Sequence, residues 1–295
     1  MKRVEGIRAV TYDCWGTLLK DRDWEGAMSK RIGALRRFVD LDETEAEALV
    51  EEAWVRHDEA WKQVETFGPG RMAAYCLEAR GIDDDDSIAS LTQTFEEASL
   101  EAGVERVEGS LETMEKLQQA NVRIGLVCDT GFTPGRVVRD LLSDVGLLDH
   151  LEVTCFSDEV GVPKPGGDIF AKALAALGAR PPEAIHIGDL RRTDIAGAHD
   201  VGMHAARYKG VHDDRTDAPE AEIVLTDHRQ ILEVLGLDLR RRYSTRVAHF
   251  KYRFRNFNAR CALRAIRYTT NMRQAAGTFG GLIVHYGQLT TALGG

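Results

Sequence analysis

Short apolar runs recur along the chain and alternate with segments of helical periodicity. A continuous apolar run suits a parallel strand that is covered on both faces. Six such strands are predicted, at residues 7–13, 122–128, 151–156, 184–188, 203–208 and 222–225. Apolar positions spaced three and four apart predict helices between them, at 110–120, 134–144, 168–178 and 193–201. This alternation predicts an α/β protein with a parallel sheet and helices on both of its faces.

Several predicted helix ends carry capping residues. Ser110 is a candidate N-cap, and Pro134 lies in the first turn of its helix. Gly178 and Gly202 follow the last periodic positions of two other helices and are candidate C-caps.

Residues 21–105 interrupt the alternation. This segment is strongly acidic, shows no convincing strand and is predicted to hold helices near 24–39, 43–65, 71–80 and 87–102. We interpret it as an all-helical insertion between the first strand and the rest of the sheet. The acidic run 83–86 suits a solvated linker and a helix N-terminus, where negative charge is favourable.

Composition excludes a membrane protein. The chain has 295 residues, and no apolar run approaches the roughly 20 residues that span a bilayer. The N-terminus lacks the apolar region of a secretion signal. Five scattered cysteines without a Cys-x-x-Cys pair favour reduced thiols. We therefore expect a cytoplasmic location and no membrane partner.

Charge is distributed unevenly. Residues 240–295 contain eleven Lys or Arg and no Asp or Glu, whereas the preceding part carries 27 basic against 47 acidic residues. We predict a basic C-terminal extension that packs on an acidic surface of its own chain or of a partner chain. Packing on a partner chain would give a homo-oligomer. Its arginines and aromatic residues also permit nucleic-acid binding. The acidic body argues against that partner, because it would repel a polyanion.

Candidate chemistry lies at the ends of predicted strands. Asp13, Cys128 and Asp189 each end or directly follow an apolar run. The carboxyl ends of parallel strands meet at one edge of the sheet, where ligands bind. Gly16 allows a sharp turn soon after the first of these residues. Lys164 lies between two prolines, which suppress helix there.

In this order, these segments resemble the four motifs of the haloacid dehalogenase-like (HAD) hydrolases. The resemblance implies a Rossmann-like core domain formed by residues 1–20 and 106–239, with 21–105 as a helical cap domain and 240–295 as an extension. It also implies a small-molecule substrate, whose identity the motifs do not reveal.

The resemblance assigns catalytic roles to individual residues. Asp13 matches the nucleophile, which forms a covalent aspartyl intermediate that water hydrolyses. Thr17 matches a supporting hydroxyl, and Lys164 matches the lysine that neutralises the substrate anion and the nucleophile.

The resemblance also implies a Mg²⁺ cofactor. Asp189 matches a direct ligand, and Asp13 and the backbone carbonyl of Trp15 match further ones. Asp194 is expected to orient metal-bound waters or to pair with Lys164. Hard oxygen ligands of this kind suit Mg²⁺.

Two positions depart from the phosphatase pattern. Trp15 stands where a second aspartate is usual, and its side chain cannot act as a general acid or base. Cys128 stands where serine or threonine is usual, and a thiol is a weak donor. Asp129 and Thr130 are candidates to compensate through their backbone N–H groups or the Thr130 hydroxyl. The alternative for Cys128 is a buried small hydrophobe.

Three functions compete on these residues. The sequence favours a Mg²⁺-dependent hydrolase of a small phosphorylated metabolite. An aromatic residue at position 15 also resembles the Asp-x-Tyr-Gly-Thr motif of the 2-haloacid dehalogenases, which use the same aspartate without metal. Gly188 and Asp189 favour the metal-binding type, because an unpaired Asp189 beside Asp13 is costly without metal. A decayed binding or accessory protein is the third hypothesis.

Polar residues in or near the helical insertion are candidates to contact the substrate, although solvated helix faces are the simpler interpretation: Arg22, Arg56, His57 and Arg71. His186 lies inside a predicted strand and is interpreted as a core residue.

Overall fold

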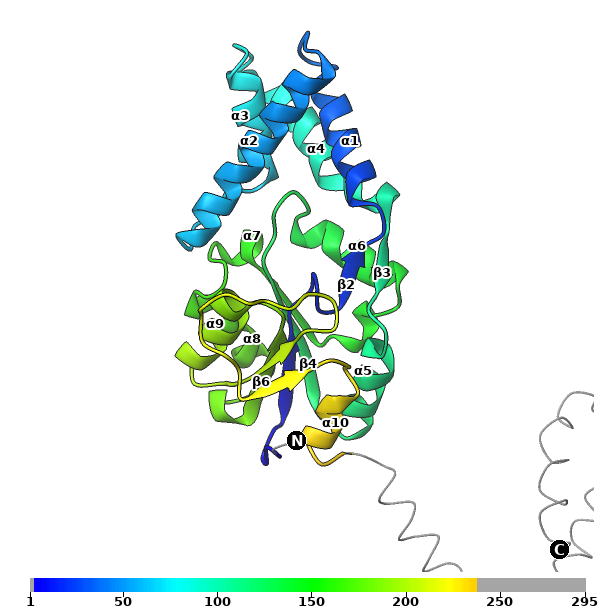
Figure 1. The fold of residues 1–295 in the computed structure, drawn as a ribbon, viewed down its shortest axis with the longest axis vertical. Coiled ribbons are helices and arrows are strands. Elements are labelled where there is room, and N and C mark those ends of the chain that lie inside the picture. Colours follow the sequence, from blue (N-terminus) through cyan, green and yellow to red (C-terminus); the bar gives the residue numbers. More distant parts are fainter. Residues whose placement is uncertain (1–2, 238–295) are drawn as a thin grey trace, which may run out of the picture. The chain divides into compact units, whose positions relative to one another are not determined.

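Six parallel strands form the central sheet, in the order β5-β4-β1-β6-β7-β8 (Figure 1). The computed structural model describes residues 3–237. The strands are β1 (Ala9–Tyr12), β4 (Arg123–Cys128), β5 (Val153–Phe156), β6 (Ala184–Gly188), β7 (His204–Tyr208) and β8 (Ile223–Leu225). Every neighbouring pair is parallel. The six predicted strands and the α/β class are therefore confirmed.

Helices cover both faces of this sheet. One face packs against α5 (Ser110–Gln119), α6 (Gly135–Asp144) and α10 (Gln230–Val234), and the other against α8 (Gly167–Ala176) and α9 (Ala196–Asp200). Successive side chains of β1 point to opposite faces of the sheet, so Val10 packs in the apolar cluster on the first face and Ala9 in the cluster on the second. The predicted helices are confirmed, although one π-helical turn, Arg191–Ile195, precedes α9. The short helices α7 (Ser157–Val160) and α10 were not predicted.

The helix ends confirm two capping predictions and correct one. Gly178 and Gly202 adopt φ angles of 55° and 82°, as glycine C-caps do. Ser110 is not an N-cap, because Gly109, with φ 80°, takes that place. The Ser110 hydroxyl instead donates to the Val107 carbonyl at 2.7 Å.

Four helices form a separate layer: α1 (Trp24–Leu35), α2 (Glu43–Lys62), α3 (Pro69–Glu78) and α4 (Asp85–Ala102). We call them the four-helix segment. They enclose an apolar cluster of their own. Side chains of Asp23, Asp42 and Asp84 cap the N-termini of α1, α2 and α4. The four predicted helices are confirmed, and the acidic run that includes Asp84 supplies a cap.

A two-stranded ribbon connects the four-helix segment to the sheet. It pairs β2 (Leu19–Asp21) with β3 (Val104–Arg106) in antiparallel fashion. The interpretation of residues 21–105 as free of strands is wrong at both ends, because these three-residue strands are too short to show a periodicity. In Figure 1 the four helices lie beyond the end of the sheet where β1, β4 and β6 terminate.

Within residues 3–237, no helix is both long and apolar enough to cross a membrane. The predicted basic extension, 240–295, lies outside the described residues.

Candidate active site

Asp13 directly follows β1 and faces the carboxyl edge of the sheet. It is 7% exposed, and its backbone N–H donates to the Ile187 carbonyl of β6 at 2.8 Å. The chain turns at Gly16, which has φ 77°. A Cβ at Gly16 would lie 2.6 Å from an Asp189 oxygen. Glycine therefore serves both the turn and the close approach of Asp189.

Lys164 links three carboxylates. Its Nζ donates to Oδ1 of Asp13 at 2.5 Å and to Oδ1 of Asp194 at 2.7 Å. Its backbone N–H donates to Oδ1 of Asp129 at 2.8 Å. The side chain is 2% exposed, so these ion pairs are protected from solvent screening.

The carboxylate of Asp194 accepts hydrogen bonds from three donors. Besides Lys164, its Oδ1 accepts from Nε2 of His186 at 3.1 Å, and its Oδ2 accepts from the Leu190 N–H at 3.0 Å. Because the carboxylate accepts, Nε2 of His186 carries the proton, and Nδ1 accepts from the Thr11 hydroxyl at 2.9 Å. His186 is fully buried in β6 and orients Asp194.

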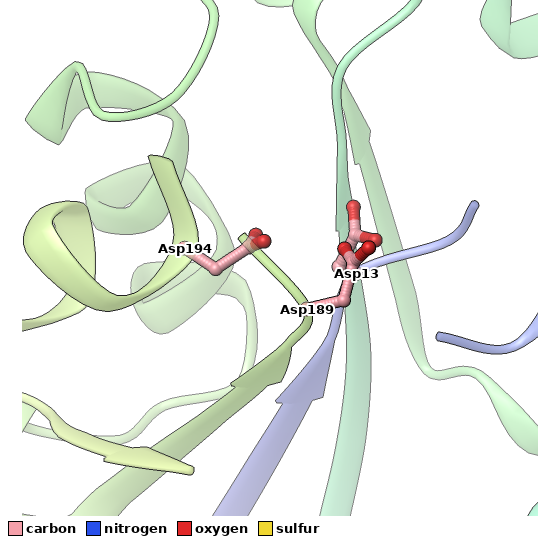
Figure 2. A group of neighbouring side chains, drawn as sticks. All are labelled: Asp13, Asp189 and Asp194. Atoms are coloured by element: carbon pink, nitrogen blue, oxygen red, sulfur yellow. The ribbon is translucent and has the colours of Figure 1, made fainter. Parts of the chain in front are cut away.

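Three carboxylates converge at this edge. One oxygen each of Asp13, Asp189 and Asp194 lies within 4.8 Å of the others. Figure 2 shows Asp194 directed from its helical turn toward Asp13 and Asp189, which extend from the ends of β1 and β6. Hard oxygen donors grouped in this way fit Mg²⁺.

Burial controls the ionisation of the cluster. Desolvation raises the pKa of Asp13 to about 7, although Lys164 opposes it. Desolvation and the charges of Asp13 and Asp194 raise the pKa of Asp189 to about 9. For Asp194, burial is outweighed by Lys164 and His186, so its pKa lies below the usual value. The raised pKa values show that one lysine does not stabilise all three carboxylates in their ionised form. A bound divalent cation would supply the missing positive charge.

The other predicted motif residues lie around this cluster. Thr17 is fully buried, and its hydroxyl has no partner among the described residues. Cys128 is also fully buried, and its thiol contacts the Asp129 carbonyl at 3.3 Å. Thr130 lines the cavity described below, but its N–H and hydroxyl both bond to Ser157. Burial raises the pKa of the Cys128 thiol well above its usual value.

A cavity of about 300 Å³ opens beside the carboxylates and reaches the four-helix segment. It unites most of the predicted site, including Trp15, Asp129 and Lys164, whereas Thr17 and Cys128 are not in its lining. It also includes residues that sequence analysis did not single out: Asp21, Trp24, Trp54, Asp58, Trp61, Ser99, Gly131, Phe132, Thr133, Leu190 and Thr193.

Only one of the four candidate substrate contacts lines this cavity. His57 does so, and its Nδ1 donates to the Phe67 carbonyl at 3.0 Å, which leaves Nε2 as an acceptor. Arg56 stacks instead on the ring of Tyr75 in α3, and Arg71 on the ring of Phe67 in the loop before α3. Arg22 donates to a backbone carbonyl of β3. Trp54 and Trp61 are seven residues apart, so both lie on one face of α2. This spacing was the feature of the sequence that could have indicated an aromatic lining.

The loop after β4 contacts α2 closely. Nε1 of Trp61 donates to Oδ2 of Asp129 at 2.8 Å, so Asp129 joins Lys164 to the four-helix segment. A Cβ at Gly131 would lie 2.7 Å from Cζ3 of Trp54 and 3.3 Å from Nε2 of His57. Only a glycine permits this approach.

Gly131→Ala is therefore expected to push α2 away from the loop and to raise KM about tenfold, since overpacking costs roughly 1–3 kcal/mol. Steady-state kinetics and thermal unfolding measure the two effects. Gly33→Ala in α1 is the matched control, because a Cβ there meets nothing within 4 Å. An unchanged KM in Gly131→Ala would show that this contact does not shape the site.

The parallel sheet thus brings three buried aspartates together at the edge where α/β proteins bind their ligands. The chain belongs to the haloacid dehalogenase-like hydrolases, whose family model matches residues 7–202. Several of its curated relatives are named as phosphatases, and the predicted family is confirmed.

Individual relatives share different parts of the chain. A glyceraldehyde 3-phosphate phosphatase of Methanopyrus kandleri is 26% identical over 235 residues, which covers 78% of this chain and 97% of the relative. For three other curated relatives that it matches, this chain spans about half of their length, between 50% and 54%.

Solved structures confirm the fold alone. An HAD phosphatase from Thermococcus onnurineus has a TM-score of 0.58 at 21% identity, covering 78% of this chain and 98% of the other. A 2-haloacid dehalogenase from Pseudomonas syringae has a TM-score of 0.57 at 23% identity, with the same coverage. Because both chemistries occur on this fold, the choice between them rests on the residues of the site.

Proposed function

We propose that the chain is a Mg²⁺-dependent phosphohydrolase that transfers the phosphoryl group of a small phosphorylated metabolite to Asp13. The supporting observation is the contact of Lys164 with Asp13 and Asp194, beside Asp189. The phosphatase names of several relatives support the same reaction.

In this proposal Asp13 attacks phosphorus, and the ester P–O bond breaks with its electron pair on the leaving oxygen. Water then attacks phosphorus and releases phosphate and Asp13. Lys164 orients the Asp13 carboxylate through Oδ1 and offsets negative charge near the phosphoryl group. Trp15 supplies no proton to the leaving group, and the loss of such an acid costs about 10²–10⁴-fold.

Mg²⁺ would be held by Asp13, Asp189 and the Trp15 carbonyl. Asp194 already accepts from Lys164, His186 and the Leu190 N–H, so we assign it an orienting role. When bound, the ion would offset the mutual repulsion of the carboxylates and the phosphate.

We propose that the four-helix segment acts as a cap that excludes water, as part of a cap domain of residues 21–105 on a core domain of residues 1–20 and 106–239. The supporting contacts are those of Trp61 with Asp129 and of Trp54 with Gly131. Thr17 and Cys128 are then assigned to support Asp13 and its strand from within the core, without touching substrate. The cytoplasmic location and the homo-oligomer stay predictions.

EDTA is expected to abolish turnover, and added Mg²⁺ to restore it. Affinity for Mg²⁺ should rise with pH, because the raised pKa values of Asp13 and Asp189 mean that protons leave as the ion binds. Each unit of pH between 6 and 8 should strengthen binding by up to about tenfold per proton released. Calorimetry in buffers of different ionisation enthalpy measures that release. Full activity in EDTA would contradict the proposal.

A 2-haloacid dehalogenase is the second candidate, favoured by the aromatic residue Trp15 beside Asp13. It requires no metal, yet Asp189 lies within the carboxylate cluster. Halide release from 2-haloalkanoates that persists in EDTA would establish this activity and displace the phosphatase proposal.

A further inference from the structure

All four tryptophans of the chain line one cavity. Trp15 follows β1, Trp24 belongs to α1, and Trp54 and Trp61 belong to α2. Phe132, from the loop after β4, adds a fifth aromatic ring. Tryptophans from three separate segments thus line the cavity beside the carboxylate cluster. Such a wall suits a planar apolar group rather than a polyhydroxylated chain.

The aromatic wall is already packed. Trp54 stacks on Phe132 with ring centroids 5.2 Å apart and planes inclined by 12°. Trp24 meets Trp54 edge-on at 5.8 Å, and His57 lies 4.9 Å from the Trp54 ring. Rings held in this way lose little freedom when a ligand binds, so the wall is preorganised for stacking.

Charge in the lining argues against a second anionic group on the substrate. Among the described residues that line the cavity, Lys164 is the only lysine or arginine, and it is engaged by Asp13 and Asp194. Asp21 and Asp58, which come from the ribbon and from α2, add further carboxylates. A bisphosphate or a phosphorylated carboxylic acid would place its second anion against these groups.

Two arginines lie close to the wall without being part of the lining. The Arg31 guanidinium lies 4.4 Å from the Phe132 ring centroid, and that of Arg192 lies 4.1 Å from the centroid of the Trp61 ring. Arg31 is buried and donates to the Phe95 carbonyl and to Ser99. The hydrogen bonds of Arg31 thus engage its guanidinium, whereas Nη2 of Arg192 has no partner among the described residues, but Arg192 is not part of the cavity lining.

The residue at position 15 favours a phosphate ester whose leaving group is acidic. Because Trp15 cannot protonate a leaving oxygen, the ester bond must break with the charge left on that oxygen. A phenol, like the tyrosine side chain, has a pKa of about 10. The pKa of an aliphatic alcohol is closer to that of water, which is about 15.7. An aryl oxide therefore leaves without the missing acid far more readily.

We propose that the substrate is an aryl phosphate monoester, whose ring stacks in the tryptophan-lined cavity while its phosphoryl group faces Asp13. This inference rests on the proposed phosphohydrolase function. The aryl O–P bond breaks with its electron pair on oxygen, a bond forms from Asp13 to phosphorus, and water later cleaves the acyl phosphate. The products are phosphate and an aryl oxide, which takes a proton from water. A cavity of about 300 Å³ suits one or two rings.

The first test separates stacking from leaving-group acidity. Turnover of phenyl phosphate by the full chain with Mg²⁺ is compared with that of a fluoroalkyl phosphate whose alcohol is as acidic as phenol. At least tenfold higher kcat/KM for phenyl phosphate is expected. Equal values, or a preference for a sugar bisphosphate, would overturn the inference and leave the phosphohydrolase function standing. If no phosphate ester is hydrolysed, the proposed function fails and the inference falls with it.

The second test measures binding without turnover. Phenylphosphonate should quench the intrinsic tryptophan fluorescence and bind at least tenfold more tightly than methylphosphonate, because all four tryptophans line the cavity. Equal binding of the two phosphonates would overturn the inference.

Substitution of the wall gives the third test. Trp54→Leu should raise KM for phenyl phosphate at least tenfold more than it raises KM for the fluoroalkyl ester. Val55→Ala, on the same helix and at a position 52% exposed, is the control. If Trp54→Leu does not fold, Trp24→Leu at a position 42% exposed takes its place. An equal effect on both esters would show that the ring is structural only.

Discussion

Asp13→Asn lowers kcat by at least about 10⁴-fold, the expected result if this carboxylate forms the covalent intermediate. The amide keeps the size of the side chain but is a poor nucleophile. The loss should appear in kcat, because Lys164 and the aromatic cavity remain to bind substrate. Rapid quenching of the wild-type enzyme, followed by peptide mass analysis, should find one phosphoryl group on the peptide that contains Asp13.

The fold of this variant should persist. Burial already raises the pKa of Asp13 to about 7, so a neutral side chain at this position costs little stability. Thermal unfolding and phenylphosphonate binding provide the control measurements. Turnover within tenfold of wild type, or a phosphoryl group on another residue, would remove Asp13 from the role of nucleophile.

Lys164→Met is expected to destabilise the protein by about 3–5 kcal/mol, because it leaves buried carboxylates without their cation. Turnover should fall with it, since Lys164 holds both Asp13 and Asp194. The loss depends on pH. Burial raises the pKa of Asp194 and Lys164 lowers it, so without the lysine this carboxyl group takes up a proton in mild acid and is then no longer an unpaired buried charge. The variant should thus suffer more at pH 8 than at pH 4.

Urea unfolding at the two pH values measures this difference. Lys172→Met, at an exposed position in α8, is the matched control and should change stability by no more than about 0.5 kcal/mol. An equal loss at both pH values would mean that Lys164 acts through packing of its aliphatic chain rather than through its charge.

Sequence predicted the sheet well because each strand is buried on both faces and leaves a continuous apolar run. Asp13 and Asp189 were predicted to lie together for a related reason, since both follow such runs and parallel strands end at the same edge. The ribbon of β2 and β3 escaped prediction, because three residues carry no periodicity and the pair is formed across more than eighty residues.

The orienting role of His186 required the structure. Its strand position indicated a core residue, and it is fully buried. Its hydrogen bond to Asp194, however, depends on the helical turn that follows Asp189, which returns Asp194 to β6. Cys128 is similar, because burial and its contact with Asp129 determine that the thiol does not line the cavity.

By itself, the sequence determined the α/β class, the family resemblance and the order of Asp13, Lys164 and Asp189, since these depend on local apolar runs and on residues next to them. Only the tertiary structure decided how the remaining residues meet. It brought Trp24, Trp54 and Trp61 to the aspartates, and Lys164 into contact with Asp194. Those contacts join segments distant in the chain, and their geometry follows from how the helices pack on the edge of the sheet.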